Sequence, residues 1–173
     1  MLPCLSLVLG GAASGKSAFA EKMIVSSDLD RVYIATSQVR DEEMRQKIDK
    51  HVAQRGAGWT TIEAPLDVAA ALAQLDASHA VLLDCATLWL TNMMLGGHDL
   101  GTAQAELLAA CVATPAPVVV VSNEVGQGIV PDNALARQFR EAQGRLNIAL
   151  AAQANCVVHV LAGLPHVRKG EMP

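Results

Sequence analysis

Short apolar runs alternate with longer segments of helical periodicity along most of this chain. The runs typical of strands start at Leu5 and continue with Arg31 to Ala35, Trp59 to Glu63, Ala80 to Asp84, Pro117 to Val121 and Cys156 to Leu161. The β-branched run that ends at Val121 is typical of a strand buried on both faces of a parallel sheet. Because strands alternate with helices, the pattern predicts an α/β fold with a mostly parallel sheet and helices on both faces.

The segments between these runs have the spacing of amphipathic helices. We expect helices at Ala18 to Val25, Asp41 to Arg55, Asp67 to Leu75, Ala103 to Ala113, and from Asp132 through Ala154. Within the second of these, Met44, Ile48 and Val52 recur every four residues and form an apolar stripe.

The last predicted helix carries three more detailed expectations. Asp132 is expected to cap its first turn. Its buried face is expected to consist of Leu135, Phe139, Ala142, Leu146 and Leu150. Gly144 interrupts the helix at a cost of about 1 kcal/mol relative to alanine, which indicates close packing or a bend.

The first strand leads directly into a glycine-rich motif with a defined chemistry. Gly10, Gly15, Lys16 and Ser17 match G-x-x-x-x-G-K-S between a strand and a helix, the context that a phosphate-binding P-loop requires. Backbone N–H groups of such a loop point at phosphate oxygens, its lysine reaches the terminal phosphates, and its serine hydroxyl coordinates Mg²⁺. A plain glycine-rich turn would explain neither the lysine nor the serine.

Polar residues follow other strands at the same predicted edge of the sheet, which is where open parallel sheets bind ligands. Thr36 and Ser37 come after the second strand, and Asp84 ends an apolar strand in the manner of a Walker B acid that helps to hold Mg²⁺. Residues 122–131 are polar and rich in glycine, so they form either a connecting loop or an active-site element. This arrangement predicts a P-loop NTPase fold of the RecA-like kind.

The stretch Thr87 to Leu95 is apolar and contains the adjacent Met93 and Met94. Paired methionines usually fill a core, although a surface for a bulky apolar substrate is the alternative.

Length, charge and cysteine content restrict the class of protein further. A chain of 173 residues predicts one domain, spanning residues 1–173. A net charge of -4 and a pI near 5.7, without a Lys/Arg cluster, argue against a nucleic-acid partner. The four cysteines lack C-x-x-C spacing, and no apolar run is long enough to span a bilayer, so we expect free thiols in a cytoplasmic protein without a structural metal.

Several blocks together resemble one enzyme family over almost the whole chain. These are GGAASGKS, YIATSQ, DEEM followed by His51 with Arg55, W-x-T-x-E at Trp59 to Glu63, VLLDC, and SNEVGQGIVPDNALARQFREAQGRLN. They look like the bifunctional adenosylcobinamide kinase / adenosylcobinamide-phosphate guanylyltransferase family of cobalamin biosynthesis. From its position, His51 would be read as a surface histidine beside the apolar stripe.

The resemblance implies two reactions: phosphorylation of adenosylcobinamide by ATP or GTP, then transfer of GMP from GTP to adenosylcobinamide phosphate through a guanylylated histidine that matches His51. Lys16 would be catalytic with His51, and Ser17 and Asp84 would hold Mg²⁺. The residues that the resemblance places at the nucleotide are Gly10, Gly11, Ala12, Ala13, Ser14, Gly15, Lys16, Ser17, Ala35, Thr36, Ser37, Val52, Ala53, Gln54, Arg55, Glu63 and Asp84. It also implies a homo-oligomer, a trimer.

Two other functions fit parts of the sequence. In a plain P-loop small-molecule kinase, His51 would be an ordinary surface residue. In a nucleotide-gated binding module, the P-loop would bind nucleotide without any group transfer.

Overall fold

The computed structural model describes residues 1–38 and 55–172. Residues 39–54, which include most of the helix expected at Asp41 to Arg55, and residue 173 lie outside the described residues. The prediction for that helix is therefore not tested.

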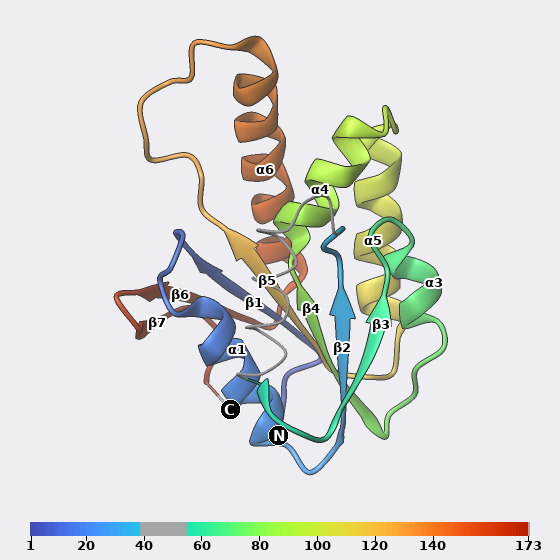
Figure 1. Cartoon of the computed structure of the whole chain (residues 1–173). Coiled ribbons are helices and arrows are strands. Elements are labelled where there is room, and N and C mark those ends of the chain that lie inside the picture. The colour runs from blue at the N-terminus through green and yellow to red at the C-terminus, as the bar shows by residue number, and fades with distance from the viewer. Residues whose placement is uncertain (39–54, 173) are drawn as a thin grey trace.

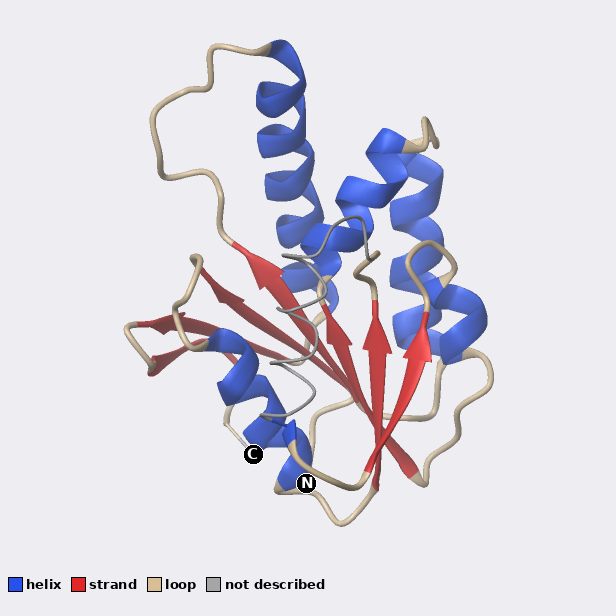
Figure 2. Ribbon diagram, in the orientation of Figure 1, coloured by secondary structure: helices blue, strands red, loops and turns tan. Residues whose placement is uncertain are grey.

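The described residues form a seven-stranded sheet in the order β3-β2-β4-β5-β1-β6-β7 (Figures 1 and 2). Neighbouring strands are parallel throughout, except that β7 runs antiparallel to β6. The strands are β1 (Leu5–Gly10), β2 (Asp30–Ala35), β3 (Trp59–Glu63), β4 (His79–Asp84), β5 (Val118–Asn123), β6 (Cys156–Leu161) and β7 (Leu164–Lys169). All six strands expected from the apolar runs are present.

Helices cover both faces of the sheet, as the sequence predicts. The described helices are α1 (Lys16–Val25), α3 (Val68–Leu72), α4 (Ala86–Leu95), α5 (Leu100–Ala113) and α6 (Ala134–Gln153). α1 packs on one face and the other four helices pack on the opposite face (Figure 1). This is a P-loop NTPase fold of the RecA-like kind, in which β5 separates the strand before the glycine loop from the strand that carries Asp84.

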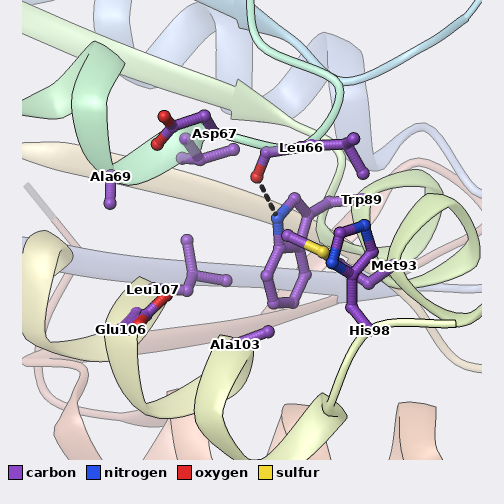
Figure 3. A pocket seen from close by; sticks show the side chains of 10 residues that line it. Leu66, Asp67, Ala69, Trp89, Met93, His98, Ala103, Glu106 and Leu107 are labelled. Carbon is purple, nitrogen blue, oxygen red and sulfur yellow. Dashed lines mark hydrogen bonds between the residues drawn. The ribbon is translucent and has the colours of Figure 1, made fainter. Parts of the chain in front are cut away.

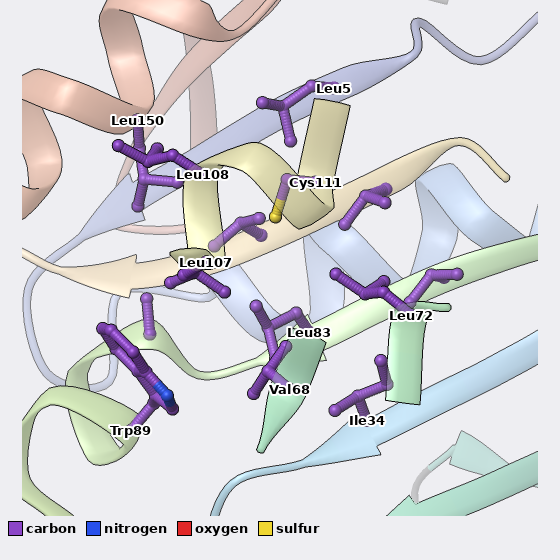
Figure 4. Close-up of a cluster of buried hydrophobic side chains, with 14 of the residues drawn as sticks. Leu5, Ile34, Val68, Leu72, Leu83, Trp89, Leu107, Leu108, Cys111 and Leu150 are labelled. Carbon is purple, nitrogen blue, oxygen red and sulfur yellow. The ribbon is translucent and has the colours of Figure 1, made fainter. Parts of the chain in front are cut away.

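Strand alternation divides the apolar side chains into two cores. The larger core lies under α3, α4, α5 and α6, where Leu83 and Ile34 of the sheet meet Trp89 and Leu107 of the helices (Figure 4). The smaller core lies under α1 and contains Val8, Leu82 and Val121. The middle strands are buried on both faces, which accounts for their continuous apolar sequences.

The structure extends the predicted strands at two places. The sequence analysis predicts no strand after Leu161, but residues 164–169 form strand β7, whose side chains are mostly exposed. Residues 122 and 123 were assigned to a loop, but they continue β5 to Asn123. In both places the backbone pairs with a neighbouring strand although the side chains do not form an apolar run.

The details expected of the last helix have different outcomes: Leu146 and Leu150 are buried as expected, whereas the cap, Leu135 and Gly144 need correction. Its N-cap is Asn133, whose side chain accepts a hydrogen bond from the Ala136 N–H at 2.7 Å, and not Asp132. Leu135 is 52% exposed because the first turns of α6 project beyond the sheet (Figure 1). Gly144 lies within the continuous helix α6 with open space where a Cβ would be, so close packing does not explain it.

The four cysteines are free thiols, as expected; Cys4 is exposed and the other three are buried. Burial raises the pKa of the Cys111 thiol to about 12, which keeps it protonated and unreactive at neutral pH. Within residues 1–38 and 55–172, no helix has both the length and the hydrophobicity needed to cross a membrane.

Candidate nucleotide-binding site

The glycine loop connects the end of β1 to the start of α1. Gly15 occupies the N-cap position of α1 with φ of 91°, in the left-handed region that glycine adopts without strain. At Gly10, an added Cβ would lie 2.3 Å from the Ser14 Oγ and 2.6 Å from the Val160 carbonyl oxygen. Glycine is therefore required at both positions by the backbone itself, as the P-loop motif predicts.

The turn between β6 and β7 contacts the glycine loop and is hydrogen-bonded to it. The Gly163 N–H donates a hydrogen bond to the Ser14 carbonyl oxygen at 2.8 Å, and a Cβ on Gly15 would lie 3.1 Å from the Gly163 Cα. The Lys16 ammonium donates to the Gly11 carbonyl oxygen at 3.1 Å, so the lysine folds back over the loop. Ser17 is half-buried in the first turn of α1.

Strand register brings Asp84, Ala35 and Glu63 into one row at the same edge. Ala35 pairs with Asp84 on β4 and with Glu63 on β3. Side chains alternate along a strand, and Tyr33 and Leu82 belong to the core beneath α1. The side chains two residues further along, on Ala35 and Asp84, therefore face the helix that begins at the P-loop.

Arg55 extends its guanidinium over two aromatic rings on this face. Its Cζ lies 3.4 Å from the centroid of the Tyr33 ring and 6.0 Å from that of Trp59. The two rings meet edge to face, with centroids 6.4 Å apart and an interplanar angle of 86°. The Arg55 Nε and Nη1 atoms are buried and have no hydrogen-bond partner among the described residues. A cation thus lies on the same side of the sheet as the row of carboxylates.

Electrostatic interactions add Glu21, which the sequence analysis missed, to this site. Burial and the Asp84 carboxylate raise the pKa of Glu21 above its ordinary value, and Arg55 opposes that rise. Burial and Asp84 likewise raise the pKa of Tyr33. Glu21 follows Ser17 by one helical turn on α1, and that spacing is the signal that could have identified it.

Thr36, which was predicted to lie beside the nucleotide, has its hydroxyl group engaged in the fold. This hydroxyl is fully buried, donates to the Cys85 carbonyl oxygen at 2.8 Å and accepts from the Cys85 N–H at 2.8 Å. The Thr36 carbonyl oxygen accepts from the Asn92 amide at 2.8 Å. The side chain therefore joins β2 to the start of α4, while Ser37 next to it is half-buried.

A buried polar cluster lies where β5 meets α6. The Ser122 hydroxyl donates to the Asn147 Oδ1 at 2.6 Å, and the Gln143 amide donates to both of these oxygens at 2.9 and 3.0 Å. Gln143 and Asn147 occupy the buried face of α6 with Leu146 and Leu150, where only apolar residues were expected. The cluster fixes α6 to the end of β5 through hydrogen bonds rather than apolar packing.

Two cavities of about 270 Å³ each lie among the helices of the opposite face, and neither is lined by a P-loop residue. The first lies between α3, α4 and α5, with Trp89, Met93 and Leu107 in its wall (Figure 3). The second lies between α4 and α6 and is lined by Met94, Leu95 and Phe139. The paired methionines thus border one cavity each, and Met93 also packs against the larger core. Whether this surface accepts an apolar substrate stays a prediction.

The remaining predicted site residues, His51, Val52, Ala53 and Gln54, lie outside the described residues. Their distance from the P-loop therefore stays a prediction. Described residues from four separate segments lie along the same edge of the sheet: Lys16 and Ser17 after β1, Ala35 on β2, Glu63 on β3 and Asp84 on β4, with three strands between β3 and β1.

A glycine cradle at a helix N-terminus, a lysine beside it and an acid at the end of β4 define a P-loop nucleotide-binding enzyme. A family model described as cobinamide kinase / cobinamide phosphate guanyltransferase matches residues 6–167. The chain belongs to this family, and it is a bifunctional kinase and guanylyltransferase of cobalamin biosynthesis.

Curated relatives agree with this assignment over nearly their whole length. The chain is 42% identical to the bifunctional adenosylcobalamin biosynthesis protein CobP of Pseudomonas aeruginosa, covering 95% of this chain and 97% of that protein. It is 44% identical to the bifunctional adenosylcobalamin biosynthesis protein CobU of Salmonella typhimurium, covering 91% of this chain and 96% of that protein.

Solved structures of similar fold are more distant. The P4 protein from bacteriophage phi6 in complex with ADP has a TM-score of 0.49 and 15% identity, with coverage of 93% of this chain and 52% of that chain. The RadB recombinase has a TM-score of 0.47 and 16% identity, with coverage of 91% and 74%.

Proposed function

We propose that this enzyme phosphorylates adenosylcobinamide with ATP or GTP and then converts the product to adenosylcobinamide-GDP through a guanylylated His51. The observation that carries the proposal is a P-loop that shares one edge of the sheet with Asp84 and Glu63, in a chain of this family. In the first step the hydroxyl oxygen of the substrate bonds to the γ-phosphorus. The bond from that phosphorus to the bridging oxygen breaks, and the nucleoside diphosphate and a proton leave.

The second reaction uses the imidazole as a carrier of GMP. A neutral imidazole nitrogen of His51 attacks the α-phosphorus of GTP, a phosphoramidate forms, and pyrophosphate departs. A phosphate oxygen of adenosylcobinamide phosphate then attacks the same phosphorus. The P–N bond breaks, the imidazole is restored, and adenosylcobinamide-GDP is released.

The described residues supply binding and charge for both steps. Backbone N–H groups of residues 10–17 and the N-terminus of α1 would bind the phosphates. Lys16 would leave the Gly11 carbonyl for the phosphates, and Arg55 would neutralise charge on the departing group. The Ser17 hydroxyl and the Asp84 carboxylate are the oxygen donors that suit Mg²⁺, which would supply positive charge at the phosphates.

Base recognition is assigned to Glu63. Its exposed carboxylate ends β3 in the same row as Ala35 and Asp84. A carboxylate accepts hydrogen bonds from the N1–H and amino group of guanine, whereas adenine lacks an N1–H. Ala35 and Ser37 lie beside this position, and Thr36 contributes through the backbone that its buried hydroxyl fixes.

Covalent guanylylation is the decisive test. Incubation with GTP and Mg²⁺ is expected to give a guanylyl adduct in the intact-protein mass spectrum, and His51→Ala is expected to abolish it. His166→Ala, on exposed strand β7, is the matched histidine control and should retain the adduct. An unmodified wild-type protein that still phosphorylates adenosylcobinamide would favour the plain kinase instead.

Two variants separate the steps. Lys16→Ala should reduce both activities by at least about tenfold, because each step uses a bound triphosphate. His51→Ala should lose GMP transfer and retain phosphorylation of adenosylcobinamide. Loss of both activities in His51→Ala, with the fold intact by circular dichroism, would contradict a separate kinase step.

The working form of the enzyme is also proposed, as a homotrimer in the cytoplasm. The support for a trimer is the family resemblance alone. Light scattering after size exclusion should give three times the mass of the chain, and a monomer mass would contradict it.

A further inference from the structure

Asn123 ends strand β5 between the two motifs that bind nucleotide in the proposed function. It pairs in register with Gly10 of the P-loop, and β5 itself lies between β1 and the Asp84 strand β4. Val119 and Val121 belong to the core beneath α1, so strand alternation turns the Asn123 side chain to that same face. Ser122, one residue earlier, points the opposite way toward α6.

The backbone of Asn123 is fixed from three directions. Its N–H donates to the Thr87 Oγ1 at 2.8 Å, and its carbonyl oxygen accepts from the Asn147 Nδ2 at 3.0 Å. The following residue, Glu124, donates its N–H to the Gly10 carbonyl oxygen at 3.1 Å. Helices α4 and α6 and the P-loop strand thus hold this one residue in place, which is the preorganisation that a ligand-contacting group needs.

One atom of the Asn123 side chain, its Oδ1, has no hydrogen-bond partner among the described residues. This atom is also buried. Buried polar atoms in native proteins are almost always hydrogen-bonded, so an orphaned amide oxygen beside a phosphate loop needs an explanation. None of the apolar contacts of the core beneath α1 provides one.

The position of β5 in the sheet fits a phosphoryl group at its end. β5 pairs with β1, which ends in the P-loop, and with β4, which ends in Asp84. A phosphoryl group bound between the P-loop and an acid that would hold Mg²⁺ would therefore lie at the end of β5, where Asn123 is.

We propose that Asn123 positions the terminal phosphoryl group in the kinase step. Its Nδ2 donates to an oxygen of the γ-phosphate, and its Oδ1 accepts a hydrogen bond from the hydroxyl group of the acceptor that attacks this phosphorus. Asn123 thereby distinguishes a triphosphate from a diphosphate and aligns the nucleophile. The inference rests on the proposed kinase activity, but it does not depend on His51.

The test compares the binding of a triphosphate and a diphosphate by calorimetry. A non-hydrolysable ATP analogue and ADP, each with Mg²⁺, are titrated into the wild type, Asn123→Ala and Asn123→Asp. Both variants should lose roughly tenfold or more in affinity for the ATP analogue and keep their affinity for ADP. Asn123→Asp should lose more, because a carboxylate then faces the γ-phosphate. An unchanged ratio of the two affinities in both variants would overturn the inference.

A matched control separates this role from a structural one. Ser122→Ala removes a buried hydroxyl from the adjacent residue, so it should lower the melting temperature without changing the ratio of ATP to ADP affinity. Should Asn123→Ala fail to fold, Asn123→Ser keeps a polar group and gives the same readout. An altered ratio together with no guanylyl adduct in the wild type would retain this inference and reject the guanylylated histidine.

Discussion

The guanidinium carbon of Arg55 lies 3.4 Å from the centroid of the Tyr33 ring, which places a cation over an aromatic side chain of strand β2. Arg55 is the first described residue after residues 39–54, and Trp59 meets the edge of the same ring. The contact therefore anchors the chain at the end of the segment that contains His51.

Removing the Tyr33 ring should weaken both the fold and guanylylation. Tyr33→Leu is expected to lower the free energy of unfolding by about 1 to 3 kcal/mol, since it loses a cation–π contact and leaves a cavity. Tyr33→Phe keeps the ring and is the control. Urea unfolding and the rate of adduct formation measure the two effects. An adduct rate in Tyr33→Leu equal to that of the wild type would show that Arg55 does not need this anchor.

Gly10→Ala should disrupt the P-loop more than Gly11→Ala does. A Cβ at Gly10 would overlap the Ser14 hydroxyl and the Val160 carbonyl oxygen, whereas a Cβ at Gly11 meets nothing within 4 Å. We expect Gly10→Ala to lower the free energy of unfolding by about 1 to 3 kcal/mol and Gly11→Ala by less than about 1 kcal/mol. Thermal unfolding without nucleotide measures both, and equal destabilisation would contradict the geometry of the loop.

Thr36→Val should destabilise the fold through Cys85. The substitution preserves shape but leaves the buried Cys85 N–H without its acceptor, which costs about 1 to 3 kcal/mol. Thr36→Ser keeps the hydroxyl and should cost less than about 1.5 kcal/mol. Denaturant unfolding of the two variants tests the assignment. A Thr36→Val protein as stable as wild type would instead favour a direct role at the nucleotide.

The free energy of unfolding of Glu21→Gln should increase, relative to that of the wild type, as the pH rises. The pKa of Glu21 is raised in the folded state above its ordinary value of 4.5, chiefly by burial and Asp84. The folded wild type therefore holds this proton to a higher pH than the unfolded chain, and its stability falls as the pH rises from 4.5 through the folded-state pKa. Unfolding of both proteins between about pH 4 and pH 7 measures the difference. A difference independent of pH would mean that the carboxylate is not perturbed.

Gly144→Ala should stabilise the protein. Gly144 is exposed in the middle of α6, and a Cβ there would have no neighbour within 4 Å. Alanine should therefore add about 0.5 to 1 kcal/mol through its higher helix propensity. The melting temperature measures this gain. A decrease would indicate that an unrecognised contact requires glycine at this position.

The local pattern of apolar and polar residues was sufficient to predict six of the strands and the edge of the sheet at which the candidate site lies. The runs ending at Ala35, Asp84 and Leu161 are buried strands, and an apolar sequence buried on both faces is hard to mistake. Strand β7 was missed because its side chains are mostly exposed and form no apolar pattern. It is a strand because its backbone pairs with β6, and composition does not reveal that pairing. Leu135 was placed in the core because helical periodicity does not show where the sheet beneath a helix ends.

The parts of the site that depend on distant contacts were the hardest to predict. Glu21 is perturbed because α1 packs against the strand that carries Asp84, a fact of tertiary structure. The Arg55 contact with Tyr33 likewise joins segments that sequence order separates. Gln143 and Asn147 were not among the residues expected on the buried face of α6, yet they hold the end of β5 through Ser122. Polar residues on a buried face indicate a hydrogen-bond network when their partners are known.

The hydrogen bond from Gly163 to Ser14 means that the nucleotide site cannot be completed early in translation of the chain. The whole glycine loop leaves the ribosome first, and the turn that donates this hydrogen bond leaves it only when residue 163 has passed the exit tunnel. A nascent chain of intermediate length should therefore hold nucleotide poorly. Ligand capture would then report that synthesis has passed the last strands of the sheet.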